Sequence, residues 1–217
     1  MKQYLLLIIL GLNMSAFSQQ IQLTPSFGAS TYYRIFPDEY YDNPNDLKLT
    51  TDIAIQYLHK VNFGTFSYGI NFTDYSGKHL DGWYGFSGYG KTEGDFHNRS
   101  VGIQFAFIDR VFNDKFEAVY GINWNYRITS SRTGYSTYYS VSSIEPYYGL
   151  LNSEGGRKFL PFLTCGLAYP ISINDQFIFV PGFKTAFGLL KEYDDYRRWS
   201  NYFSLGLRYD FTASDKK

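Results

Sequence analysis

The stretch His97-Asn98-Arg99-Ser100 carries residue types that nucleophilic catalysis uses, a histidine close to a serine. A serine nucleophile needs the imidazole on its own face, within hydrogen-bond reach of the hydroxyl. The flanking residues alternate apolar with polar types, which predicts a strand, and positions 97 and 100 of a strand point to opposite faces. The other histidines, His59 and His79, fall in a predicted turn and a predicted loop. We therefore assign no catalytic residue.

Metal and redox chemistry find little support in the residue pattern. The segment 37–46, PDEYYDNPND, holds carboxylates, which are the hard oxygen ligands that calcium prefers, but it lacks the spacing of a defined calcium loop. Cys165 is the single cysteine, so the chain has no internal disulfide and no CxxC motif. A solvated acidic loop is the simpler interpretation, and we expect no metal site and no cofactor.

The N-terminal residues 1–18 have the features of a secretory signal peptide. Lys2 precedes an apolar run, and the pattern Ala16-Phe17-Ser18 favours cleavage after Ser18. This run is shorter than the roughly 20 residues of a spanning helix, and no later run is long enough. The formal net charge of zero removes the usual electrostatic argument for a nucleic-acid partner. If the exported chain meets a membrane, it does so through strands.

Alternation with a period of two, the signature of a strand, recurs along the exported chain. Phe203, Leu205 and Leu207, for example, alternate with small or charged residues. The connections are alternately short and long, the long ones being 37–48, 76–96, 129–157 and 189–200. The alternation predicts eight strands, near 21–36, 49–58, 64–75, 97–108, 115–128, 158–169, 176–188 and 201–211. We expect an all-β, antiparallel, up-and-down meander with its long loops at one end.

Side-chain size indicates which face of these strands points outward. Aromatic residues make up 21% of the chain, and many fall on the apolar set of strand positions. The interior of an eight-stranded barrel is just wide enough for its own side chains, so these rings suit the outside. An even number of antiparallel strands with loops sorted by length is the layout of a bacterial outer-membrane barrel. Residues 19–211 are then an eight-stranded transmembrane β-barrel with extracellular long loops, periplasmic termini and a short tail, 212–217.

The opposite face of the strands carries small and charged residues, which suit the lumen. If Phe36 lies opposite Thr50, Arg34 lies opposite Asp52 and the two can form an ion pair. Such charges either satisfy one another in a filled interior or line a narrow pore, and the small size of an eight-stranded barrel favours the filled interior. Glu117 and Arg208 fall toward the periplasmic end, and Lys184 nearer mid-height. The predicted lumen network comprises Arg34, Asp52, Glu117, Arg127, Lys184, Arg208 and Asp210.

The last predicted strand ends Ser204-Leu205-Gly206-Leu207-Arg208-Tyr209-Asp210-Phe211. It resembles the C-terminal assembly signal of outer-membrane β-barrel proteins, with Ser204, Gly206, Tyr209 and Phe211 at the matching positions. The resemblance implies insertion by the barrel-assembly machinery. The chain is similar to small porin-like outer-membrane barrels of Gram-negative bacteria, which share a fold far more than a function.

Three classes of function stay open at this point. The first is a structural or surface-interaction protein whose long loops meet a partner; tyrosines in 129–157 suit such contacts. The second is a narrow porin-like channel, and the third is a lipid-modifying enzyme. The enzyme is disfavoured because His97 and Ser100 point to opposite faces of the predicted strand. His97 and Arg99 fall at a strand end, where they can contact lipopolysaccharide phosphates. We expect a monomer surrounded by outer-membrane lipid and lipopolysaccharide.

Overall fold

The computed structural model describes residues 19–33, 48–85, 88–140, 147–152, 157–192 and 197–211. The predicted signal peptide, 1–18, and the predicted tail, 212–217, lie outside the described residues. Among the described residues, no helix is long and apolar enough to cross a membrane.

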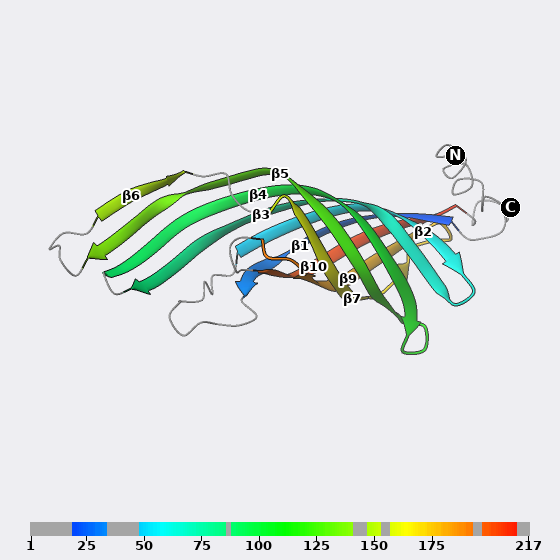
Figure 1. The fold of residues 1–217 in the computed structure, drawn as a ribbon. Helices are drawn as coiled ribbons and strands as arrows, with labels where there is room; N and C mark the ends of the chain where they lie inside the picture. The colour runs from blue at the N-terminus through cyan, green and yellow to red at the C-terminus, as the bar shows by residue number, and fades with distance from the viewer. Residues whose placement is uncertain are drawn as a thin grey trace, which may run out of the picture.

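The described chain is built from strands that close into a barrel (Figure 1). Consecutive wall strands pair antiparallel, and the last strand pairs back to the first, with Ile21 opposite Tyr209. The strands are β1 (Gln19–Tyr33), β2 (Lys48–Val61), β3 (Gly64–Gly85), β4 (Gly88–Val111), β5 (Phe116–Ser140), β6 (Tyr147–Asn152), β7 (Phe159–Ala168), β8 (Ile171–Ser172), β9 (Phe177–Gly188) and β10 (Arg197–Asp210). Eight of them, β1 to β5, β7, β9 and β10, form the wall, which confirms the predicted meander barrel.

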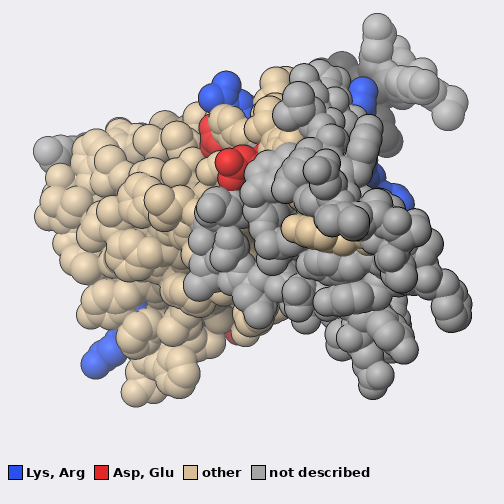
Figure 2. Space-filling model, turned by 90° about the vertical axis from the view of Figure 1, so that its left-hand side faces the viewer, with Lys and Arg blue, Asp and Glu red and all other residues tan. Residues whose placement is uncertain are grey.

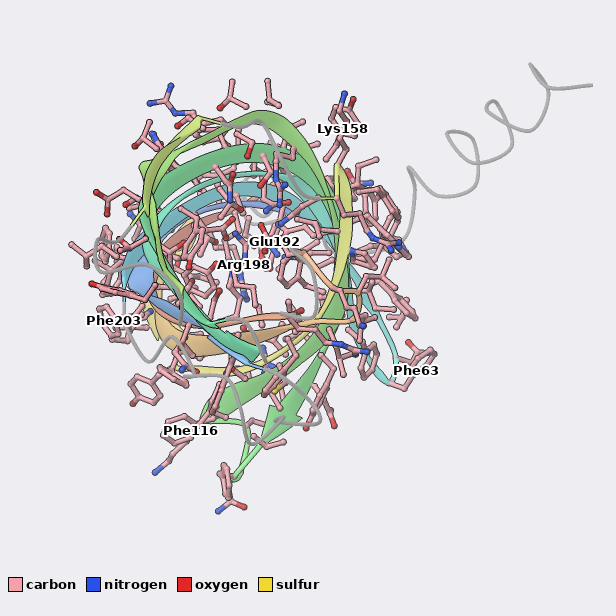
Figure 3. The ribbon with its side chains drawn as sticks, turned by 60° about the vertical axis from the view of Figure 1, so that its left-hand side comes forward. Phe63, Phe116, Lys158, Glu192, Arg198 and Phe203 are labelled. Atoms are coloured by element: carbon pink, nitrogen blue, oxygen red, sulfur yellow. The ribbon has the colours of Figure 1, made fainter. Side chains whose placement is uncertain are left out.

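The wall has an apolar outside and a polar inside, as the side-chain sizes predicted. Ile103 is 53% exposed and Phe203 52%, whereas Gln104, next to Ile103 in sequence, is 6% exposed. Figure 3 shows Phe203 outside the ring of strands, and Glu192 and Arg198 inside it. On the face seen in Figure 2, charged side chains lie mainly at the margins of the described surface. Such a wall places its apolar side chains toward lipid.

Aromatic rings gather at the end of the barrel that carries the short turns. Phe63, in the turn after β2, packs against Phe66 and Phe107 at centroid distances of 6.0 and 6.1 Å. On the neighbouring hairpin, Phe116 packs against Tyr169 at 5.1 Å. Aromatic rings at this height are typical of the girdle that outer-membrane barrels place at a membrane interface.

At the other end, four strands run beyond the rest of the wall. The pairing of β2 with β3 ends at Thr50 opposite Tyr75, but β3 and β4 stay paired up to Gly85 and Gly88. Similarly, β5 continues to Ser140, where β6 adds a further strand. We call residues 76–85, 88–97, 131–140 and 147–152 the sheet extension; it projects on the left of Figure 1.

The sheet extension corrects the predicted loops 76–96 and 129–157, which are mostly strand. The predicted strands 64–75, 97–108 and 115–128 are accordingly too short. Alternation between apolar and polar types marks a strand where one face meets lipid and the other the lumen. In the sheet extension the sequence lacks this regular alternation, so the ladder continues there without the pattern that marks a strand in sequence.

Candidate functional site

Inside the barrel, charged side chains form three successive layers, and the first lies near the short turns. Arg208 donates to both carboxylate oxygens of Glu117, at 2.8 and 2.7 Å, in a bidentate pair. Gln22 accepts a further hydrogen bond from Arg208 Nε at 2.9 Å. Both charged side chains are 6% exposed. Strand parity directs residues 117 and 208 inward from β5 and β10, so the two meet across the lumen.

The second layer lies at mid-height around Asp52. Lys184 Nζ donates to Asp52 Oδ2 at 2.7 Å, and Asn71 and Thr73 each donate to Asp52 Oδ1 at 2.9 Å. The ammonium group of Lys184 also lies 4.9 Å from the ring centroid of Tyr202. Asp52 is 2% exposed, so its charge is satisfied entirely inside the barrel.

The predicted register of the first hairpin is wrong. Thr50 lies opposite Gly28, not Phe36, and Asp52 lies opposite Ser26. Ser26 therefore holds the position opposite Asp52 that the prediction gave to Arg34. Arg34 itself lies outside the described residues. The lysine that does meet Asp52 comes from β9, a strand distant in sequence.

The third layer lies in the lumen toward the sheet extension, and its centre is Glu192. Arg127 Nη2 donates to Glu192 Oε1 at 2.6 Å, and Arg198 Nε lies 3.5 Å from Oε2. The guanidinium of Arg198 lies between two aromatic rings, 4.9 Å from Tyr75 and 4.7 Å from Phe162. Glu192 and Arg198 point into the barrel in Figure 3. All three charged side chains are at most 4% exposed.

Sequence reasoning missed Glu192 and Arg198 because both fell within the predicted loop 189–200. The inward direction of Arg198 follows from strand parity once β10 is extended to Arg197, because Arg198 lies on the same face as the buried Ser200 and Tyr202. Glu192 follows β9 in an irregular segment, where no period fixes the direction of a side chain. Asp210, the remaining member of the predicted network, accepts a hydrogen bond from Gln20 at 2.6 Å.

A second group of charges lies on the outside of the barrel, around Asp74. His97 Nε2 lies 2.5 Å from Asp74 Oδ1, and Arg99 Nε donates to Asp74 Oδ2 at 3.1 Å. The side chains of His97 and Arg99 are 42% and 52% exposed. Ser100 is buried at 5%, so the structure places it on the face opposite His97. A carboxylate shared by His97 and Arg99 was not part of the predicted rim site.

The residues of the predicted assembly signal end β10. Gly206 lies where an added Cβ would be 2.9 Å from Gln22 Nε2 and 3.1 Å from the Val180 backbone, so a larger residue would displace its neighbours. Tyr209 packs against Phe177 and Phe211 at centroid distances of 5.1 and 5.0 Å. Ser204 is half-buried within the same strand. These contacts fix the strand that closes the barrel onto β1.

No family model matches the sequence, and no curated protein matches it. Solved structures similar to the chain include Neisserial surface protein A, with 10% identity, 88% of this chain and 97% of that chain covered, and a TM-score of 0.44. The architecture is that of an outer-membrane β-barrel. Ail, the attachment invasion locus protein of Yersinia pestis, has 12% identity, with 87% and 97% covered and a TM-score of 0.38. The outer membrane protease OmpT from Escherichia coli has 8% identity, with 92% and 99% covered and a TM-score of 0.36. A fold of this kind assigns no activity by itself.

Proposed function

We propose that the chain is an integral outer-membrane protein with a closed lumen, and that it acts as a structural or surface-interaction protein through its sheet extension. The observation that carries this proposal is the contrast between the two ends of the wall strands. Three buried charged layers cross the lumen, while β3 to β6 continue past the barrel. In this proposal the sheet extension is extracellular and the short turns are periplasmic.

The length of the central strands supports an interaction surface. A spanning strand needs about 9–11 residues. β4 has 24 residues and β5 has 25, so each continues well beyond the lipid zone. Tyrosines recur along the sheet extension, and a tyrosine offers a large contact area with few rotatable bonds. Tyr139, for example, is 47% exposed.

The proposal predicts that shortening the sheet extension abolishes contact and leaves the barrel intact. Ser76 lies opposite His97, so an Asn-Gly turn can replace residues 77–96 without changing the register below. Cells that display this variant should lose retention on protein-coated surfaces, while the variant keeps its heat-modifiable gel mobility. The matched control replaces residues 86–87 with Asn-Gly and keeps the sheet extension. Unchanged retention of the shortened variant would contradict the proposed role.

The closed lumen is tested separately in planar bilayers. The wild-type protein should give no regular conductance steps, because three ion-paired layers cross the described lumen. Reproducible steps would instead favour the narrow porin-like channel. The lipid-modifying enzyme receives no support from His97, since its carboxylate partner is present but Ser100 faces inward.

We also propose that His97 and Arg99 contact lipopolysaccharide phosphates. Both side chains point outward, and Arg99 lies two residues before the outward-facing wall position Val101, where the proposal places the lipid headgroups. Asp74 accepts a hydrogen bond from Arg99 and so competes with a phosphate for this guanidinium. Arg99→Ala should lower the lipopolysaccharide that co-purifies with the protein, whereas Arg110→Ala, an exposed arginine at the short-turn end, should not. Equal amounts in both variants would remove this contact from the proposal.

Insertion by the barrel-assembly machinery is the remaining proposal, and Phe211 is its test. Phe211 is 42% exposed at the end of β10, where a partner can reach it. We expect Phe211→Ala to lower the amount of folded protein in the outer membrane, measured as the heat-modifiable band. Phe203→Ala, on the outer face of the same strand, should have a smaller effect. The reverse order would argue against recognition of the strand end.

A further inference from the structure

A cavity of about 70 Å³ lies inside the barrel between the first and the second charged layers. We call it the lumen chamber. Glu117 and Arg208 line one end, Lys184 lines the region nearer mid-height, and the amide side chains of Gln22, Gln56 and Gln104 line the wall between them. Apolar side chains such as Val180 and Phe183 line the rest of the space. The polar groups that reach it from several strands distinguish it from the dry apolar cavities of a packed core.

Gln104 differs from the other two glutamines of the lumen chamber. Gln56 accepts a hydrogen bond from Thr24 and donates one to Ser67, and Gln22 also makes side-chain hydrogen bonds. The Nε2 atom of Gln104 is buried, and it has no hydrogen-bond partner among the described residues. The residue is 6% exposed and lines the chamber. A buried amide donor of this kind is costly unless water satisfies it.

The volume and the charges of the chamber limit what can occupy it. One ordered water needs roughly 10–15 Å³ of such space, so the chamber accommodates a small cluster. Its charged groups are already paired, Arg208 with Glu117 and Lys184 with Asp52. Paired charges leave no net charge to hold an ion, whereas amide and carboxylate groups suit water as donors and acceptors.

We infer that the lumen chamber binds a cluster of ordered water molecules and that the Gln104 amide is a donor to it. The lower half of the lumen is then solvated rather than packed, and what closes the barrel is a set of thin charged layers. This inference goes beyond the proposed function, since a surface-interaction protein needs a closed lumen but not a wet one.

Nuclear magnetic resonance of the refolded protein in detergent micelles tests the inference directly. The side-chain NH2 of Gln104 should show cross-peaks to water. The side-chain NH2 of Asn71 is the matched control, because it donates to Asp52 and Thr73 and does not line the chamber. A Gln104 signal without water cross-peaks, as for Asn71, would overturn the inference.

The direction in which a substitution at Gln104 shifts the urea midpoint of unfolding is an independent test. If water satisfies Gln104, Gln104→Leu should lower the urea midpoint of unfolding, because the cluster loses a partner and meets an apolar group. In a dry chamber the same change removes an unsatisfied donor, so the midpoint should rise. Gln56→Leu is the control and should lower the midpoint in either case, since it breaks two side-chain hydrogen bonds. A higher midpoint for Gln104→Leu would reject the water cluster.

Discussion

Glu117→Leu should lower the free energy of unfolding of the barrel by about 3–5 kcal/mol, the range for removing one partner of a buried ion pair. The change leaves the Arg208 guanidinium inside the lumen without the carboxylate that now accepts two of its hydrogen bonds. Both side chains are 6% exposed, so bulk water compensates little. Among the described side chains, Gln22 is the acceptor that remains, and together with the few waters of the lumen chamber it is too weak a partner for the full charge.

Urea unfolding in lipid vesicles, followed by the gel mobility of the folded form, measures this loss. The double variant Glu117→Leu/Arg208→Leu is the control. Replacing both members of a buried pair by apolar residues is often nearly neutral, so the double variant should recover most of the stability. A double variant less stable than the single one would mean that the pair itself, and not the stranded charge, accounts for the effect.

Ile103→Arg should cost about 2–4 kcal/mol, the range for a basic side chain on the lipid face near the bilayer midplane. Ile103 is 53% exposed on the outer wall and lies between Ile70 on β3 and Trp124 on β5. Its neighbours are apolar on both sides, so an arginine there has no polar partner within the wall.

The same vesicle unfolding experiment measures the cost of Ile103→Arg, with Thr133→Arg as the matched control. Thr133 is exposed on the sheet extension, where it lies opposite Asp95, and an arginine there meets water. Its cost should be near zero. Similar costs at the two positions would mean that lipid does not surround Ile103, and the boundary of the lipid zone would have to move.

The barrel could be predicted from sequence because lipid and lumen impose opposite demands on successive residues. At Ile103 and Gln104 the two demands are visible as an apolar residue followed by an amide. The sheet extension could not be predicted in this way. Residues 88–95, GYGKTEGD, carry no apolar alternation in sequence, although they continue β4.

The charged layers could be predicted in part, and the difference lies in register. The pairing of Glu117 with Arg208 can be predicted from two properties of each residue: the face of the strand on which it lies, and its distance from the short-turn end. Each lies a few residues from that end of its strand. The residue opposite Asp52 could be predicted only from the register of the first hairpin, which composition does not define. The partner of Asp52, Lys184, lies five wall strands away in chain order. Glu192 lies outside any strand, so no periodic rule reaches it.

The continuity of the sheet extension with the wall has a consequence for how this protein can diverge. Adding one residue to each of two paired strands near Gly85 and Gly88 lengthens the hairpin but leaves every pair below it unchanged. Lipid does not constrain these positions and neither does the lumen. Across related sequences, length and composition should therefore vary fastest in the sheet extension, in matched steps on partner strands, while the barrel keeps its parity.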